Sequence, residues 1–498
     1  MGDSLVHYAI LLTAILLLAS SCSFFPSALV PLKEAPESPQ VAWNTRRIEK
    51  KAEKLGDKIA KRLLPIRLPE QEEPLSLAEL IDVALQNNVV TQKTWALAKE
   101  KAALYGKSEQ NFFPLINGTY VYDRTRALAL SGSASAGVIN QIVYQSLWSP
   151  QLALSFLVFD FGQTRATSQA ALQALYNANL THNREIQTLI ATISSDYYTY
   201  LYQQALLISY EQDVADAQTV LDAANLRLHS GVTDIADMLQ AKSQLLQAQT
   251  QMVSQKQAVQ VSGSQLLADM GLPAHIPLHL EMMPEEPPVF EIMTSVQELI
   301  HLALKKRSDL FAKEANLRSQ ELILSAAKRR MLPSVNSQFS YGRTSYSGTG
   351  IPGHVTDHYD FEGTLSLSWS LFNGFFDLNT IRQAESARDY ARALLDQTEL
   401  QVVEDVTNAH SDVAVSREAL NYAQDFLKAA QEEYRVTLAQ YKSGTKDILT
   451  VVSAQTSLAT ARSVRASALQ HWFVSLSTLA YATGVIESNP RSFLGENS

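Results

Sequence analysis

The strongest constraint on the fold is that the chain repeats itself once, over residues 74–271 and again over 295–484. SLAELIDVALQNN recurs as SVQELIHLALKKR, and LRLHSGVTDIADMLQAKSQL is matched by AQYKSGTKDILTVVSAQTSL. Leu80 and Leu299 lie 219 residues apart, whereas Gly231 and Gly444 lie 213 apart, so one indel of six residues accounts for the change of offset. Each copy can therefore be one half of a joint structure rather than an independent domain.

The composition and net charge of the chain argue against nucleic acid as a partner. The chain has 498 residues, of which 46% are hydrophobic, and a formal net charge of −9. An acidic chain is a poor match for nucleic acid, whose phosphates require a basic surface. The one basic stretch, RRIEKKAEKLGDKIAKRLL over residues 46–64, alternates bases with acids, which favours a solvated helix over a lipid-binding arm.

The first residues are typical of a targeting segment. The apolar run from Ala9 to Ala19 is too short to span a bilayer, so residues 1–21 are predicted to be a signal peptide. Cys22, the only cysteine, follows small residues and resembles the lipidated cysteine of bacterial lipoproteins. A covalent lipid on Cys22 is then expected, with no other cofactor; the alternative is an ordinary signal peptide and an incidental cysteine.

Each copy also contains two helices of unusual length. Gln163 to Ser230 and Phe375 to Ser443 lack both Gly and Pro, and a continuous helix of that length measures roughly 100 Å. Such helices need coiled-coil partners, and apolar residues seven apart after Gly231, including Leu245 and Leu266, supply a heptad seam. We predict helical hairpins over about 163–270 and 375–483, with sharp turns at Gly231 and Gly444.

Before each long helix the pattern becomes alternating, as in LSLSWSL from Leu365 to Leu371. We predict β-hairpins over about 115–161 and 334–373, which is four strands in all. Four strands cannot close a barrel in a membrane, so other copies of the chain would have to complete it. The alternative is that the strands pack on the helices in a soluble α+β domain.

The order of short helix, strand hairpin and long helix pair, present in both copies, resembles the TolC-like outer membrane factors of Gram-negative bacteria. The shared motifs are the strand-starting prolines, the aromatic-glycine exits into the long helices and the two helical turns. The resemblance covers residues 74–484, divided into repeat 1 (74–273) and repeat 2 (295–485). Outside them lie an N-terminal linker with the charged helix (22–73), a Pro-rich linker (274–294) and a tail (486–498).

The resemblance implies a mainly α protein with a transmembrane β part: a homotrimer whose strands form one twelve-stranded barrel and whose helices form a twelve-helix periplasmic tunnel. It implies a lipid-anchored outer membrane duct for efflux or type I secretion, which is a passive channel and not an enzyme. An inner-membrane pump and a periplasmic adaptor would be its partners. The expected adaptor contacts are at the tips: Arg227, Leu228, Gly231, Tyr441, Ser443 and Gly444.

Gating residues are expected at the same tips. Related channels close there, and Tyr441 and Lys446 match the aromatic and basic positions that lock them. Asp234, Asp237 and Asp447 could add charge or pair with Arg227 and Lys446, although acids at helix starts also favour the helix dipole on their own. Thr450 and Ser453 occupy positions where the archetypal channel has aspartates, so the same acidic ring is not expected. Because the two tips differ in sequence, we expect them to divide adaptor contact and gating unequally.

Two other readings stay open at this point. A periplasmic coiled-coil tether or adaptor could use similar hairpins without a pore. His354 and His358 with Asp357 could hold a metal, although a polar surface loop is the simpler reading. No catalytic or nucleotide-binding motif stands out, and the cargo cannot be inferred from the residues.

Overall fold

The computed structural model describes residues 54–55, 57–61, 74–131, 139–283, 295–348 and 357–486; within the strands, the side chains of 127–131, 139–141 and 143 are not described. The chain forms two compact units, Met1–Pro69 and Glu70–Ser498. In the first unit, the described residues are helical and mostly exposed. The predicted signal peptide, Cys22, His354 and most of the tail lie outside the described residues.

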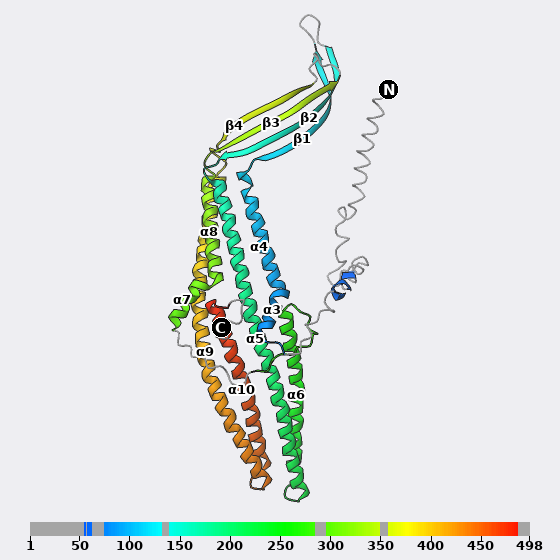
Figure 1. The fold of residues 1–498 in the computed structure, drawn as a ribbon, viewed down its shortest axis with the longest axis vertical. Helices are drawn as coiled ribbons and strands as arrows, with labels where there is room; N and C mark the ends of the chain where they lie inside the picture. The colour runs from blue at the N-terminus through cyan, green and yellow to red at the C-terminus, as the bar shows by residue number, and fades with distance from the viewer. Residues whose placement is uncertain are drawn as a thin grey trace. The chain divides into compact units, whose positions relative to one another are not determined.

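The second unit contains the same series of elements twice (Figure 1). The first copy consists of α3 (Leu77–Asn87), α4 (Val89–Ser108), a 3-10 turn η2 (Glu109–Phe112), β1 (Leu115–Ser131), β2 (Ile139–Phe159), α5 (Gln163–His229) and α6 (Ile235–Asp269). The second copy consists of α7 (Val296–Lys306), α8 (Ser308–Arg329), β3 (Ser334–Gly348), β4 (Asp357–Ser368), α9 (Phe376–Lys442) and α10 (Ile448–Thr483).

The long helices pack side by side in the order α6, α5, α10, α9 (Figure 1). On α6 the predicted seam residues Leu245 and Leu266 are buried, and Ala241 and Ala248, on either side of Leu245, are buried with them. Small residues at these positions let the helix axes approach closely, which the sequence pattern of large apolar residues did not reveal. At the upper end α4 packs on α5, and α8 packs on both α5 and α9.

The four strands form one antiparallel sheet in the order β1-β2-β3-β4, with β2 and β3 joining the two copies. The mainly helical class with four strands is confirmed. The predicted second hairpin is shorter than expected, because β4 ends at Ser368. Trp369 leaves the strand, and its indole Nε1 donates to the carbonyl of Met331 at 3.0 Å. Within the described residues, β1 and β4 each have one unpaired edge.

Each strand-to-helix exit uses two successive residues with positive φ. These are Phe161 and Gly162 in the first copy, and Gly374 and Phe375 in the second. Only one residue of each pair is glycine, and its position is exchanged between the copies. A phenylalanine in this region is strained. Asp160 accepts from the amides of Gly162 and Thr164, at 2.9 and 2.6 Å, which satisfies the first turn of α5.

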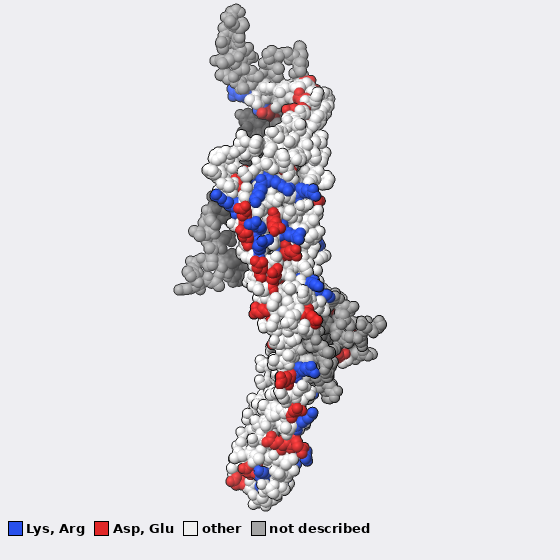
Figure 2. Space-filling view, turned by 90° about the vertical axis from the view of Figure 1, so that its left-hand side faces the viewer, with Lys and Arg blue, Asp and Glu red and all other residues white. Residues whose placement is uncertain are grey.

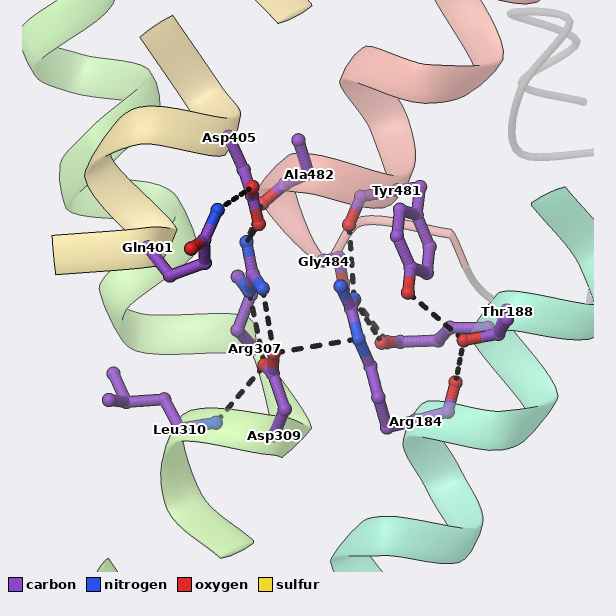
Figure 3. A network of polar contacts seen from close by, with 11 residues as sticks. Arg184, Thr188, Arg307, Asp309, Leu310, Gln401, Asp405, Tyr481, Ala482 and Gly484 are labelled. Atoms are coloured by element: carbon purple, nitrogen blue, oxygen red, sulfur yellow. Dashed lines mark hydrogen bonds and ion pairs between the residues drawn. The ribbon is translucent and has the colours of Figure 1, made fainter. Parts of the chain in front are cut away.

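A buried ion network fixes the short helices to the long ones (Figure 3). The Arg307 side chain, 3% exposed, lies between Asp309 of α8 and Asp405 of α9, at 2.6 and 2.7 Å. Arg184 of α5 lies 3.7 Å from Asp309 and stacks over the Tyr481 ring of α10. The network therefore joins four helices that lie far apart in sequence.

The equivalent place in the first copy uses a neutral contact. Asn88 caps α4 and donates through Nδ2 to the carbonyl of Asp269 at 2.7 Å. Part of the predicted Pro-rich linker is also ordered by pairing: Leu280 forms a parallel bridge with Leu75, just ahead of α3. The sequence indicated neither contact.

Candidate functional site

The sheet has one continuous apolar face. The strand register places every second residue of each strand on this face, because directly paired residues share a side of the sheet. Leu365 is 73% exposed and Phe361 is 79% exposed, so none of the described helices covers them. The face is formed by Ile116, Tyr120 and Tyr122 of β1, Trp148, Leu152 and Leu154 of β2, Phe339 and Tyr341 of β3, and Tyr359, Phe361, Leu365 and Leu367 of β4.

The opposite face is mainly polar, although β1 also places Leu115 and Val121 on it. It carries Asn117 and Thr119 of β1, Gln151 and Ser155 of β2, Asn336, Gln338 and Ser340 of β3, and Thr364, Ser366 and Ser368 of β4. Figure 2 shows an uncharged band over this end of the molecule, between charged residues at the far end of the sheet and those on the helices.

Aromatic side chains border the apolar face at two levels. Tyr122 and Trp148 lie 4.6 Å apart between ring centroids, and Tyr341 and Tyr359 lie 6.2 Å apart, towards the far end of the sheet. Phe159 with Phe161, and Phe372 with Phe375, lie at the end nearest the helices. An apolar band between two aromatic belts is the pattern of a strand wall in a lipid bilayer. The soluble alternative, in which the strands pack on the helices, is therefore wrong.

At the other end of the long helices lie two tight turns, α5 to α6 and α9 to α10 (Figure 1). Gly231 and Gly444 have φ of 71° and 83°, as the sequence predicted. The amides of Val232 and Thr445 donate back to the carbonyls of Arg227 and Gln440, at 3.0 and 2.9 Å. Both turns are thus closed by the same glycine-dependent hydrogen bonds.

Arg227 links the two turns. Its Nη1 donates to the carbonyl of Tyr441 at 2.8 Å and to that of Lys446 at 3.3 Å. Its Cζ lies 4.4 Å from the centroid of the Tyr441 ring, and Tyr441 is fully buried. Burial is the main reason that the pKa of Tyr441 is raised, with Asp237 adding to the shift and Arg227 opposing it. At the tips, the guanidinium of Arg227 therefore connects the first copy to the second.

The acids at the tips act as helix caps. Asp234 accepts from the amide of Ala236 at 2.8 Å, and Asp447 accepts from the amide of Thr450 at 3.1 Å and from its hydroxyl. Asp237 accepts from the hydroxyl of Thr233. The hydrogen bonds that Asp447 accepts, first from the hydroxyl of Thr450 and then from its amide, lower the pKa of Asp447.

Of the two roles open to these acids, direct pairing with Arg227 or Lys446 is not seen at these turns, although the charge of Lys446 helps to lower the pKa of Asp447. In the described part of the chain, neither Arg227 nor Lys446 forms an ion pair with Asp234, Asp237 or Asp447. The physical reason is that each carboxylate is already occupied by the first turn of its own helix or by a neighbouring hydroxyl. Lys446 contributes its backbone carbonyl, and Ser453 lies exposed on α10.

The expected contact residues differ in exposure. Gly231, Ser443 and Gly444 are exposed, and Arg227 and Leu228 are half-buried, whereas Tyr441 is buried and cannot present its ring to a partner. Sequence reasoning missed the apolar side chains that surround the turns and stand in solvent, namely Leu226, Val232, Ile235, Leu239 and Leu449. Their signal was available, because large apolar residues beside a predicted turn have no core to enter.

A second charged contact lies further along the helices. Arg462 of α10 pairs with Asp213 and Asp216 of α5, and Tyr434 of α9 donates to the carbonyl of Asp216 at 3.3 Å. Burial raises the pKa of Asp213, although the hydrogen bond from Arg462 opposes that shift. Sequence analysis did not predict this cluster, because Arg462 lies 249 positions from Asp213 and Tyr434 lies 218 positions from Asp216.

Two classes of feature are missing from the described residues. They contain no group of three or more His, Cys, Asp or Glu side chains placed to hold a metal ion. His358 instead lies 3.1 Å from Asp360. None of the helices with described coordinates is long and apolar enough to cross a membrane.

Comparison with known proteins gives a family match. The family model described as outer membrane efflux protein matches residues 80–272 and 299–485, once for each copy. Protein CyaE of Bordetella pertussis is 23% identical over 390 residues, which are 78% of this chain and 80% of CyaE. The toluene efflux pump outer membrane protein TtgC of Pseudomonas putida is 23% identical over 394 residues, 78% of each chain.

Solved structures with the same fold include two outer membrane proteins. The Campylobacter jejuni CmeC outer membrane channel superposes with a TM-score of 0.72 at 15% identity, over 86% of this chain and 93% of CmeC. The outer membrane protein VceC of Vibrio cholerae gives 0.70 at 17% identity, over 82% and 96% of the two chains.

Proposed function

Because the chain belongs to the outer membrane efflux protein family, we propose that it is the outer membrane exit duct of a tripartite efflux or secretion system. The helical part lies in the periplasm and the sheet in the outer membrane. The duct is passive, and a periplasmic adaptor and an inner-membrane pump are its partners. The energy and the choice of cargo belong to the pump.

The sheet carries this proposal. Its apolar face is exposed over all four strands, its polar face is suited to a water-filled lumen, and both outer edges are unpaired in the described chain. In lipid, unpaired backbone groups cost several kcal/mol each, so the edges must meet other strands. A homotrimer would close them into twelve strands, with β1 of one copy beside β4 of the next.

The helices support the same assembly. α6 and α9 lie at the two ends of the helix row, and each has an exposed apolar stripe. On α6 the stripe contains Leu239, Leu246 and Val253, which are seven residues apart. Heptad spacing suits a second coiled-coil seam, here with α9 of a neighbouring copy, where Leu400, Val403, Val415 and Tyr422 are exposed.

The tips would provide adaptor contact and gating. We assign contact to the exposed turns, with Leu228, Gly231, Ser443 and Gly444 and the neighbouring Leu226, Val232, Ile235 and Leu449. We assign closure to Arg227, Tyr441 and the carbonyl of Lys446. Arg227 belongs to the first copy, and Tyr441 and Lys446 belong to the second, so one set of contacts includes both copies. We therefore divide the tasks between the exposed turns and these buried contacts, instead of unequally between the two copies.

The test is assembly and conductance of the full chain. Protein extracted from outer membranes should migrate as a heat-sensitive trimer and should conduct ions in planar bilayers. A protein that stays monomeric and never conducts would overturn the duct. A pore-less tether has no use for the apolar face, and nothing in the described sheet favours it. We also propose that Cys22 carries a lipid; mass spectrometry of the mature N-terminus tests this separately.

A further inference from the structure

Charged residues on the described part of the sheet are sorted by face. The apolar face carries Arg124, Arg126, Arg343 and a single acid, Asp357, all at the end far from the helices. The polar face carries Asp123, Asp360 and Glu362 with His358, and has no Lys or Arg. These charges lie on β1, β3 and β4, because β2 has no Asp, Glu, Lys or Arg. The basic side chains are thus confined to one face of the described sheet.

The three arginines lie immediately at or beyond the outer aromatic belt. Arg124 and Arg126 follow Tyr122 on the same face of β1, paired with Ser146 and Tyr144. The guanidinium of Arg126 lies 5.7 Å from the Tyr144 ring, so the two side chains are on the same side of the sheet, and the register places that side with Tyr122 and Trp148. Arg343 is paired with Tyr359 and stacks on its ring at 5.5 Å.

Two of the arginines have no anionic partner within the described residues. Arg343 is engaged by Asp357 in a two-point contact. Arg124 and Arg126 are exposed, and no described carboxylate pairs with either. Two guanidinium groups that face outward at the level of the membrane surface are thus available to an external anion.

The geometry fixes which leaflet they meet. The helices continue from the opposite end of the sheet (Figure 1) and lie in the periplasm, so the arginines lie at the outer surface of the outer membrane. The outer leaflet of that membrane is built from lipopolysaccharide, whose lipid A carries phosphate groups at the level of its sugar headgroup. Aromatic belts mark the depth at which such headgroups begin.

We propose that Arg124 and Arg126 form a docking site for the lipid A phosphates of lipopolysaccharide on the outer wall of the sheet. Guanidinium groups bind phosphate through two parallel hydrogen bonds, and the neighbouring aromatic rings offer a surface for the acyl chains and sugar. The cargo is excluded as occupant, because the site is on the side away from the polar lumen face. The inference rests on the membrane placement and on no property of the pump.

The test uses the full chain, purified from outer membranes, delipidated in detergent and titrated with bis-phosphorylated lipid A while native mass spectrometry counts the bound lipid. The double variant Arg124→Gln/Arg126→Gln should bind roughly tenfold more weakly, since charge-assisted contacts to both guanidiniums are lost. Arg124→Lys/Arg126→Lys should retain part of the affinity. The matched control is Arg417→Gln/Arg435→Gln, which removes two exposed arginines of α9 in the periplasmic part and should bind as the wild type does.

Three further ligands show whether the site recognises the phosphates of lipid A or phosphate from any source. Dephosphorylated lipid A, phosphatidylglycerol and inorganic phosphate should each bind more weakly than bis-phosphorylated lipid A and should not distinguish the Gln variant from the wild type. Unchanged lipid A affinity in the Gln variant would overturn the site, as would equal binding of phosphatidylglycerol. Oligomer mobility is recorded for each variant, and if the Gln variant fails to assemble, the Lys variant must still show reduced affinity.

Discussion

At the tips, Arg227 reaches from the first copy to the second and combines three contacts, two to backbone carbonyls and one to the face of a buried tyrosine ring. These contacts of Arg227 do not depend on an acidic side chain, because the nearby Asp234 and Asp447 serve as helix caps. The closed arrangement should therefore tolerate loss of a carboxylate better than loss of this guanidinium.

Replacing Arg227 by Ala tests these contacts. Removal of the carbonyl contacts and the ring contact should cost the closed tip about 2–3 kcal/mol, which shifts the closed-to-open equilibrium by roughly 30- to 150-fold. The measurement is single-channel conductance in planar bilayers. Arg435→Ala is the matched control, since it removes an exposed arginine of α9 that pairs only with Glu432. Equal conductance of the two variants would show that Arg227 does not hold the tips.

Asp196 provides a prediction about pH. Its pKa is raised from the ordinary 3.8 to about 7, first by burial and then by the neighbouring carboxyl group of Asp269. The folded protein therefore binds more protons than the unfolded chain between about pH 4 and pH 7, and its stability falls as the pH rises through that window. Because the group is partly solvated, about 1–2 kcal/mol is at stake.

Thermal unfolding of wild type and Asp196→Asn at several pH values checks this. The wild type should lose stability relative to the variant between about pH 4 and pH 7, and the difference should level off above that range. Asp412→Asn, at an exposed position of α9, is the control and should follow the wild type. A constant difference between wild type and Asp196→Asn across the range would contradict the assignment.

At the scale of elements, the buried Arg307 adds an ion network to the apolar packing of α8 on α9 and also contacts the Ala482 carbonyl of α10. Arg307→Met would leave Asp309 and Asp405 without their shared cation, and breaking such a pair costs about 3 kcal/mol or more. Arg318→Met on the same helix breaks only an exposed pair with Glu314 and should stay within about 0.5 kcal/mol. Thermal unfolding midpoints are measured for both variants. Similar midpoints would show that the ion network does not contribute to the stability of the protein.

Two helix-ending glycines make a second comparison. Gly231 and Gly271 have φ of 71° and 79°, so alanine at either costs about 1 kcal/mol in backbone strain. A Cβ at Gly231 meets nothing within 4 Å, whereas at Gly271 it would lie 2.6 Å from the carbonyl oxygen of Asn87. Gly271→Ala should therefore be clearly more destabilising than Gly231→Ala in thermal unfolding. The reverse order would mean that α3 and α6 are not held as closely as described.

The sequence predicts elements well where local pattern decides them. Absence of Gly and Pro marks α5 and α9, and glycine marks both tips. It predicts partners poorly, because Arg307 meets Asp405 across 98 positions and Arg227 meets Tyr441 across 214. The end of β4 was also missed, since the alternation continues to Leu371 while the indole of Trp369 binds Met331 and turns the chain.

At the scale of the whole molecule, the account depends on a sheet that one chain cannot complete. Its apolar face needs lipid, its polar face needs water, and its edge strands β1 and β4 need each other in different copies. Contacts of this head-to-tail type either close into a ring or grow into a filament. The duct requires closure after three copies.

Cysteine cross-linking between the edges measures this directly. Thr119→Cys on β1 is combined in one chain with Thr364→Cys, Ser366→Cys or Ser368→Cys on β4, all on the polar face, and the membranes are treated with a short thiol cross-linker. The account predicts that at least one pair gives a ladder of one, two and three linked chains that stops there, and that single-cysteine variants give none. A ladder beyond three chains, or monomers alone for every pair, would contradict a closed trimeric barrel.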